Sequence, residues 1–255
     1  MEKLRFVLLL SLIINSAYGQ KIWEKSSFLG AGSLQIKDEA NFGLVFHGPS
    51  VNYGRNWKFL NDNRLINIES EIGVGVLFSK KIPGLNFYLK PVDIEYLLRF
   101  DLKNKPFYVG PSLKMEYNYN LYPDLQSGFD FWFTKYCIGV TSVYSMNVKQ
   151  SVLQVKINSS LFGLVSRQPE YRNPYFYDLG IGHAVRHLHQ DLVFGSFGRY
   201  NTCKMELLLK NRQHSRFGIG YVFEYAGFYK SPQISIVNHS IKLIIGKKTR
   251  INEFT

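Results

Sequence analysis

Apolar and polar residues alternate over long stretches of this chain. In residues 66–78, isoleucine, valine and phenylalanine occupy one parity, and the other holds asparagine, glutamate and glycine as far as residue 75; only Ser70 interrupts the apolar side. A period of two is that of a β-strand. These thirteen residues would rise about 43 Å, whereas a strand in a globular protein usually has about 5–6 residues. The pattern therefore predicts an unusually long strand with one apolar face.

The same alternation recurs farther along the chain. Residues 92–102 and 107–119 repeat it on either side of the polar segment Lys103-Asn104-Lys105-Pro106, which predicts a hairpin with a tight turn. Shorter alternating segments occupy residues 153–158, 203–210, 217–225 and 241–245. In residues 129–144 the parity changes near Phe133 and Thr134, which predicts a β-bulge there. No amphipathic helix longer than two turns and no linker interrupts the pattern, so we expect one all-β domain.

The first nineteen residues differ from the rest. Lys3 and Arg5 precede the apolar run of residues 6–14, and a small-x-small pattern ends at Gly19. This arrangement is typical of a secretory signal peptide, so we expect residues 1–19 to be removed and residues 20–255 to form the mature domain. After this segment no apolar run approaches the ~18 residues of a membrane-spanning helix.

A long strand that is apolar on one face and charged on the other fits a barrel in a membrane. Aromatic residues make up 16% of the chain and cluster at strand ends, where a membrane barrel places its interfacial girdles. Strands in hydrocarbon must have all backbone groups paired, which requires closure. We therefore expect a closed antiparallel transmembrane β-barrel in the outer membrane of a Gram-negative cell. A secreted, soluble β-protein is the alternative.

The chain length bounds the number of strands. Residues 21–245 supply 225 positions, and a transmembrane strand with its share of loops takes roughly 18–22 residues. We expect 10–12 strands and prefer twelve. Residues 164–191 lack clean alternation and contain Pro169 and Pro174, so we expect a long loop there, either outside the membrane or folded into the mouth of the barrel.

The chain also resembles a family. Leu161-Phe162-Gly163-Leu164, followed by Glu170-Tyr171 and Pro174-Tyr175, and the closing segment from Asn238-His239-Ser240 to Gly246 are similar to uncharacterised outer-membrane barrels of Bacteroidetes. The resemblance covers most of the chain. It implies a fold and a location but no reaction.

The charge of the chain indicates its partners. The formal net charge is +12. A secreted chain does not meet nucleic acid, so the partners that we expect are outer-membrane lipids and lipopolysaccharide, whose phosphates attract basic proteins. The barrel-assembly machinery and small solutes complete the expected partners. We expect no cofactor.

Charged residues gather on the polar parity of the predicted strands, which faces the lumen of a closed barrel. Carboxylates and cations can compensate each other there, because an unpaired buried charge is costly. Paired carboxylates for glycoside chemistry are an alternative role. The charged residues that we expect to face the lumen are Glu69, Glu71, Asp93, Glu95, Arg99, Lys114 and Glu116.

The densest group of potential metal ligands lies in residues 183–191. In an extended chain His187, His189 and Asp191 share one face, and imidazole and carboxylate groups are ligands for Zn²⁺. A loop that contains histidines by chance is the plainer interpretation. Cys137 and Cys203 could pair in an oxidising compartment, and the sequence leaves this open.

His239 and Ser240 invite comparison with lipid hydrolases, but adjacent residues of a strand point to opposite faces. No catalytic constellation passes this geometric test. We therefore favour a non-enzymatic outer-membrane barrel with a structural, adhesive or small-solute transport role. The alternative is a lipid-modifying enzyme, an acyl hydrolase of lipid A or phospholipid.

Overall fold

The computed structural model describes residues 22–61, 63–102, 105–123, 129–167, 188–189, 191–211 and 216–250. The predicted signal peptide lies outside these residues. Eleven strands and one short 3₁₀ helix, η1 (Glu39–Asn41), form the described part. The strands are β1 (Ile22–Asp38), β2 (Val45–Leu60), β3 (Arg64–Ser79), β4 (Ile82–Leu102), β5 (Lys105–Tyr122), β6 (Phe129–Val148), β7 (Ser151–Arg167), β8 (Val193–Ser196), β9 (Tyr200–Asn211), β10 (Phe217–Phe228) and β11 (Ile234–Arg250).

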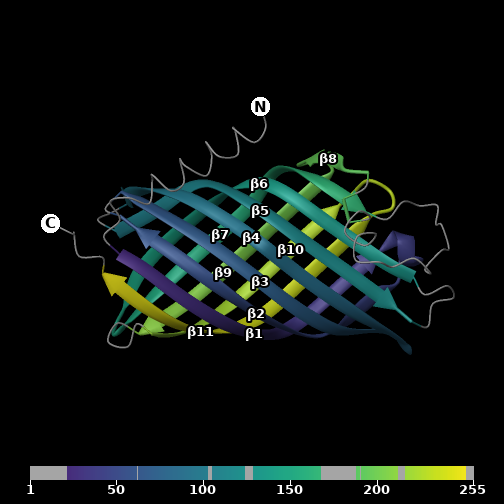
Figure 1. Ribbon diagram of the computed structural model, residues 1–255, viewed down its shortest axis with the longest axis horizontal. Coiled ribbons are helices and arrows are strands. Elements are labelled where there is room, and N and C mark those ends of the chain that lie inside the picture. Colours follow the sequence, from purple (N-terminus) through teal and green to yellow (C-terminus); the bar gives the residue numbers. More distant parts are fainter. Residues whose placement is uncertain are drawn as a thin grey trace.

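Ten of these strands form a closed antiparallel barrel (Figure 1). Each strand pairs with its sequence neighbour, β7 pairs with β9, and β1 closes the ring by pairing with β11 from Ile22↔Arg250 to Asp38↔Ile234. The eleventh strand, β8, pairs only with residues 162–165 of β7 and lies outside the ring. Among the described residues, no helix is long and apolar enough to cross a membrane.

The expected closed all-β barrel is confirmed, but the preference for twelve strands is wrong. The strands are longer than the ~9–11 residues with which a β-strand usually crosses a membrane: β4 alone has 21 residues and β6 has 20. Because the strands are this long, ten of them account for most of the chain, and too few residues remain for two more. The strand β7 also continues to Arg167, into the segment expected to be a loop, and residues 168–187 of that segment lie outside the described residues.

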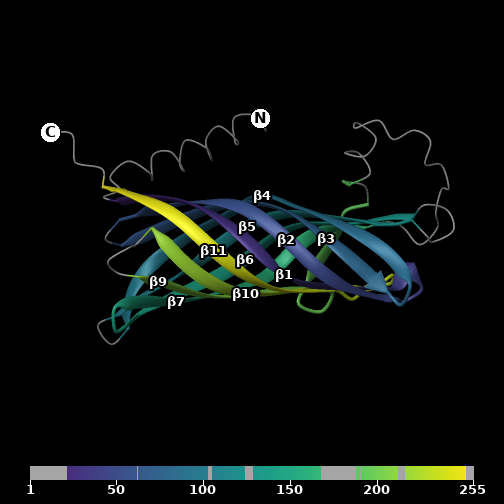
Figure 2. The ribbon, with the colours of Figure 1, turned by 90° about the horizontal axis from the view of Figure 1, so that it is seen from below.

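The two ends of the barrel differ. At the end where β1 begins and β11 ends, which we call the turn end, the described connections are short, as at Lys149 and Gln150 between β6 and β7. At the opposite end, the loop end, η1 joins β1 to β2, and β7 is separated from β9 by β8 and residues 168–192. Figure 2 shows that the barrel is elongated between these ends.

A β-bulge in β4 changes which side chains face inward. Glu69 pairs with Asp93, whereas Glu71 pairs with Lys90, so Pro91 and Val92 together stand opposite one residue of β3. Proline has no amide hydrogen for the ladder and is tolerated at such a bulge. The extra residue places both Lys90 and Asp93 inside the barrel, although their numbers have opposite parity.

The bulge predicted near Phe133 and Thr134 is not found at that position. The ladder between β5 and β6 is continuous there, and the register shift in β6 lies between Ile138 and Gly139, in its pairing with β7. The apparent change of parity arises because Phe131 and Phe133 are apolar yet face inward, where both are almost completely buried.

The outer face of the barrel is apolar. Ile72, Val74 and Val76 are 55%, 54% and 43% exposed, and Leu, Ile, Val and Phe occupy equivalent outward positions on the other long strands. A water-soluble protein rarely leaves such a continuous apolar surface uncovered.

The interior contains two apolar layers. At the loop end, a cluster that includes Phe46, Leu77, Phe131, Phe133 and Tyr200 fills the lumen. At the turn end, two smaller clusters lie in the lumen beside polar side chains; their buried members are Leu65, Leu97, Tyr108 and Val143 in one and Phe28, Leu208 and Ile244 in the other. A Cβ atom at Gly54 would meet the Phe28 ring at 2.2 Å, so glycine at this position makes room for the aromatic side chain. The functional site lies between the two layers.

Candidate functional site

The centre of the barrel interior holds a network of buried lysines and carboxylates. Its middle is Lys90, which is completely buried. Lys90 Nζ lies 2.5 Å from Glu69 Oε1, 2.8 Å from Glu71 Oε2 and 4.0 Å from Asp93 Oδ2. Adjacent strands β3 and β4 supply these four residues, and the bulge at Pro91 brings Lys90 to the same side as the acids. One lysine thus faces three carboxylates.

Two lysines from the opposite wall join this centre. Lys204 Nζ of β9 lies 3.2 Å from Glu69 Oε1 and 3.0 Å from Glu224 Oε1. Lys242 Nζ of β11 lies 3.6 Å from Glu71 Oε2 and 4.0 Å from the centre of the Phe28 ring. Residues that are far apart in the sequence therefore tie the two walls together across the lumen.

Two further groups extend the network along β4 to β7. Lys156 Nζ lies 2.6 Å from Glu95 Oε1, whose other oxygen accepts a hydrogen bond from Asn67 Nδ2 at 2.8 Å. Glu116 forms ion pairs with Lys135 and, at 3.8 Å, with Lys114. Lys114 also donates a hydrogen bond to Asn158 Oδ1 at 3.2 Å.

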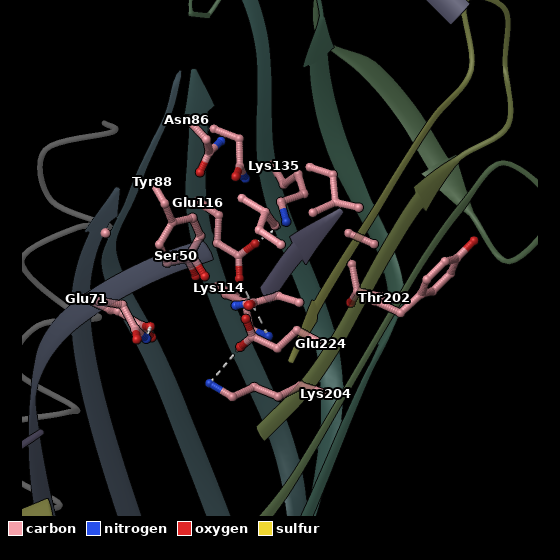
Figure 3. Close-up of a pocket in the computed structure, with 18 of the residues that line it drawn as sticks. Ser50, Glu71, Asn86, Tyr88, Lys114, Glu116, Lys135, Thr202, Lys204 and Glu224 are labelled. Atoms are coloured by element: carbon pink, nitrogen blue, oxygen red, sulfur yellow. Dashed lines mark hydrogen bonds and ion pairs between the residues drawn. The ribbon is translucent and has the colours of Figure 1, made fainter. Parts of the chain in front are cut away.

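A cavity of about 60 Å³ lies among these groups. Figure 3 shows Glu71, Tyr88 and Glu116 on one side of this space, with Lys204 and Glu224 on the other. Tyr88 Oη and Asn238 Oδ1, which both belong to lining residues, have no hydrogen-bond partner among the described residues. A ten-stranded barrel is wider than the eight-stranded kind whose side chains just fill the interior, which accounts for the space.

The sequence-predicted lumen residues fall into two groups. Glu69, Glu71, Asp93, Glu95, Lys114 and Glu116 are each at most 6% exposed and lie in the network. Arg99 is different: it lies near the turn end, its side chain is 37% exposed, and its Nη2 contacts Asp101 Oδ1 at 2.9 Å. The barrel interior opens toward solvent at this level of β4.

Sequence reasoning did not select Lys90 or Lys135. The signal for Lys90 was available, because Leu85, Phe87 and Leu89 alternate on one parity and Pro91 then interrupts the strand. Lys135 was hidden because the inward aromatic residues Phe131 and Phe133 made the parity of β6 ambiguous.

The three residues of the metal hypothesis are only partly described. His187 lies outside the described residues. The His189 ring stacks on Tyr117 with 5.6 Å between ring centres, and its Nε2 lies 3.1 Å from Tyr136 Oη. Asp191 is exposed. No group of three metal-ligating side chains occurs among the described residues, and the hypothesis for the complete trio stays a prediction.

His239 and Ser240 point to opposite sides of the barrel wall. Ser240 is buried inside, whereas His239 is exposed on the outer face, with its Nδ1 2.7 Å from Tyr221 Oη. Cys137 and Cys203 are both free. Cys137 is buried on the inner face, beside the loop-end apolar cluster.

Solved structures similar to this chain are outer-membrane β-barrels. The translocator domain of the autotransporter NalP from Neisseria meningitidis has 10% identity and a TM-score of 0.44, with 96% of this chain and 95% of that chain covered. The outer membrane protease OmpT from Escherichia coli has 9% identity and a TM-score of 0.41, with 91% and 97% covered. Ail, the attachment invasion locus protein of Yersinia pestis, has 10% identity and a TM-score of 0.33, with 88% and 99% covered.

No protein-family model matches the chain, and no curated protein matches it. The resemblance to Bacteroidetes barrels thus stays a prediction. The names of the three similar structures describe different roles, so the similarity selects none of them.

Proposed function

We propose that the protein is an integral outer-membrane β-barrel with a closed lumen, which acts as a structural or adhesive scaffold and not as an open diffusion pore. The observation that carries this proposal is the distribution of polarity. Apolar side chains cover the outside of the ring, while lysines and carboxylates are buried within it. This arrangement suits a hydrocarbon exterior, because a barrel leaves no unpaired backbone edge in the membrane.

In this proposal, side chains of the strands close the lumen. The loop-end and turn-end apolar layers flank the charged centre, and both are built from residues of the barrel wall. Passage of a polar solute would require at least the loop-end layer to separate. The central cavity can hold a small polar molecule, and two smaller cavities at the turn end are lined by polar side chains that include Asn56, Lys58 and Glu206.

Two measurements test this proposal. The mature chain should occur in the outer-membrane fraction, and an unboiled sample should migrate differently from a boiled one in an SDS gel. In planar bilayers the purified barrel should show no stable channel. A soluble periplasmic protein would refute the membrane role, and a large steady conductance would refute the closed lumen.

A lipid acyl hydrolase is the second candidate, and one observation favours it. On the outer face, His239 of β11 is paired in register with Ser33 of β1, and Tyr221 Oη engages its Nδ1. Residues directly opposite on neighbouring strands have Cβ atoms about 4.5–5.5 Å apart. Hydrolysis of phospholipid by the wild type that disappears in both Ser33→Ala and His239→Ala would support this candidate. Activity retained in either variant would exclude this pair of residues.

A further inference from the structure

Two cations, Lys25 and Arg55, lie at outward positions on the described outer face of the barrel, away from the strand ends. Away from the first and last two residues of each strand, Lys25 and Arg55 are the only charged side chains at outward positions among the described side chains. Both are exposed. A charged side chain that faces lipid lowers the stability of a barrel, most of all near the centre of the bilayer. Two cations on an otherwise apolar face therefore indicate a specific role.

These cations lie close together. Arg55 of β2 pairs in register with Ser27 of β1, and Lys25 pairs with Trp57, so Lys25 and Arg55 are diagonal neighbours on adjacent strands. Diagonal neighbours are about 7–8 Å apart, a separation that two long side chains can bridge. Both cations can therefore reach one ligand.

A tyrosine holds the guanidinium in place. Arg55 Nε donates a hydrogen bond to Tyr53 Oη at 3.2 Å, and Ser27 lies in register opposite Arg55 on β1. Arg55 forms no ion pair with an acidic residue among the described residues. The hydroxyls of Tyr53 and Ser27 add further polar groups beside the two cations, so the cluster has an excess of positive charge and an anion would relieve it.

The level of the cluster on the barrel matches a lipid headgroup. Toward the loop end, Arg55 is followed by Tyr53 and Val51, which are 41% and 48% exposed. Toward the turn end its outward neighbours are Trp57 and Phe59. Aromatic side chains, tryptophan above all, mark the interface between hydrocarbon and water. The cluster therefore lies where hydrocarbon gives way to phosphate.

We propose that Lys25, Ser27, Tyr53 and Arg55 form a binding site for the phosphate of an anionic phospholipid in the leaflet at the turn end of the barrel. This inference rests on the proposed membrane-spanning role. The guanidinium presents several donors to phosphate oxygens in a fixed geometry, and the lysine adds a mobile charge. The ligand is a phospholipid because the cluster faces the lipid side of the barrel wall and not its interior.

The test compares lipid binding by matched variants of the folded barrel. Native mass spectrometry of the detergent-purified protein would titrate phosphatidylglycerol and, separately, phosphatidylcholine. In the variant Lys25→Gln/Arg55→Gln we expect the affinity for phosphatidylglycerol to fall by about 10- to 30-fold, since each basic residue near a membrane surface contributes to binding of anionic lipid. The control Lys105→Gln/Lys149→Gln removes two exposed charges at the same end and should change it less than threefold.

The results distinguish a specific phosphate site from two cations that have no specific ligand. A preference of the wild type for phosphatidylglycerol that is lost in the first variant and retained in the control supports the site. Equal losses in both variants, or no preference in the wild type, would overturn it and leave two cations that only extend toward the headgroups. Heat-modifiable migration of every variant shows separately that the barrel is folded. If the wild type itself fails to insert into vesicles, the membrane role fails and this inference with it.

Discussion

Loss of the Lys90 charge should destabilise the barrel strongly. Lys90 is completely buried and lies 2.5 Å and 2.8 Å from oxygens of Glu69 and Glu71. At an effective dielectric constant of about 20, each contact corresponds to about 6 kcal/mol of gross attraction. Desolvation of the ions offsets much of this, and removal of one partner from a buried pair typically costs about 3–5 kcal/mol.

The expected magnitude for Lys90→Met lies at the lower end of that range, about 3 kcal/mol. The reason is that Lys204 and Lys242 also approach Glu69 and Glu71, at 3.2 Å and 3.6 Å, and continue to screen them after Lys90 is lost. Methionine keeps the length of the side chain, so the change isolates the charge. Removing one carboxylate as well, in Lys90→Met/Glu71→Gln, should recover at least half of the lost free energy because the charge count is restored.

Equilibrium unfolding in urea provides the assay. The purified barrel would be folded into phosphatidylcholine vesicles and followed by tryptophan fluorescence, with heat-modifiable migration as a second probe. Lys105→Met, at the exposed start of β5, is the matched control and should change the free energy of unfolding by less than about 0.5 kcal/mol. The reasoning is refuted if Lys90→Met unfolds like the control, or if the double variant is no more stable than the single one.

Three further predictions concern the two faces and the lumen. Val74→Arg should lower stability in the same assay by about 2–4 kcal/mol, since Val74 is 54% exposed on the outer face, while Val74→Leu should be nearly neutral; equal effects would contradict the face assignment. In planar bilayers, Phe46→Ala/Phe133→Ala alone should not open a channel, because the turn-end clusters remain. Addition of Phe28→Ala and Leu97→Ala should raise the conductance. A channel in the first variant would disprove the idea that side chains close the lumen at both ends. Mass spectrometry without reduction should find both cysteines as free thiols, and a disulfide between Cys137 and Cys203 would contradict the fold.

The sequence predicted those parts of the fold in which one face of a strand is apolar and the other polar. Residues 66–78 lie within β3, and the predicted hairpin corresponds to β4 and β5 with its turn after Leu102. The alternation fails wherever the interior is itself apolar. In β6, inward Phe131 and Phe133 mimic a change of parity, and the sequence alone does not separate them from outward residues.

The site was less accessible to sequence reasoning than the fold. Alternation groups the acids Glu69, Glu71, Asp93 and Glu95, because neighbouring strands in a hairpin share a polar face. It does not show which lysine reaches which acid. The contact of Lys204 with Glu69 crosses the lumen from β9 to β3, and depends on the ring closing with ten strands. A ring of twelve strands would have been wider, and these walls would lie farther apart.

The buried charges also account for the register of the strands. A shift of one residue moves every side chain of a strand to the other face. For β3 such a shift would turn Glu69 and Glu71 outward into the apolar belt and bring Ile72 and Val74 into the charged centre, where Lys90, Lys204 and Lys242 would lose their partners. Each lysine left unpaired in the interior adds to the cost of the wrong register. A purely apolar interior would tolerate the slip far better, so the network contributes specificity even where its net effect on stability is small.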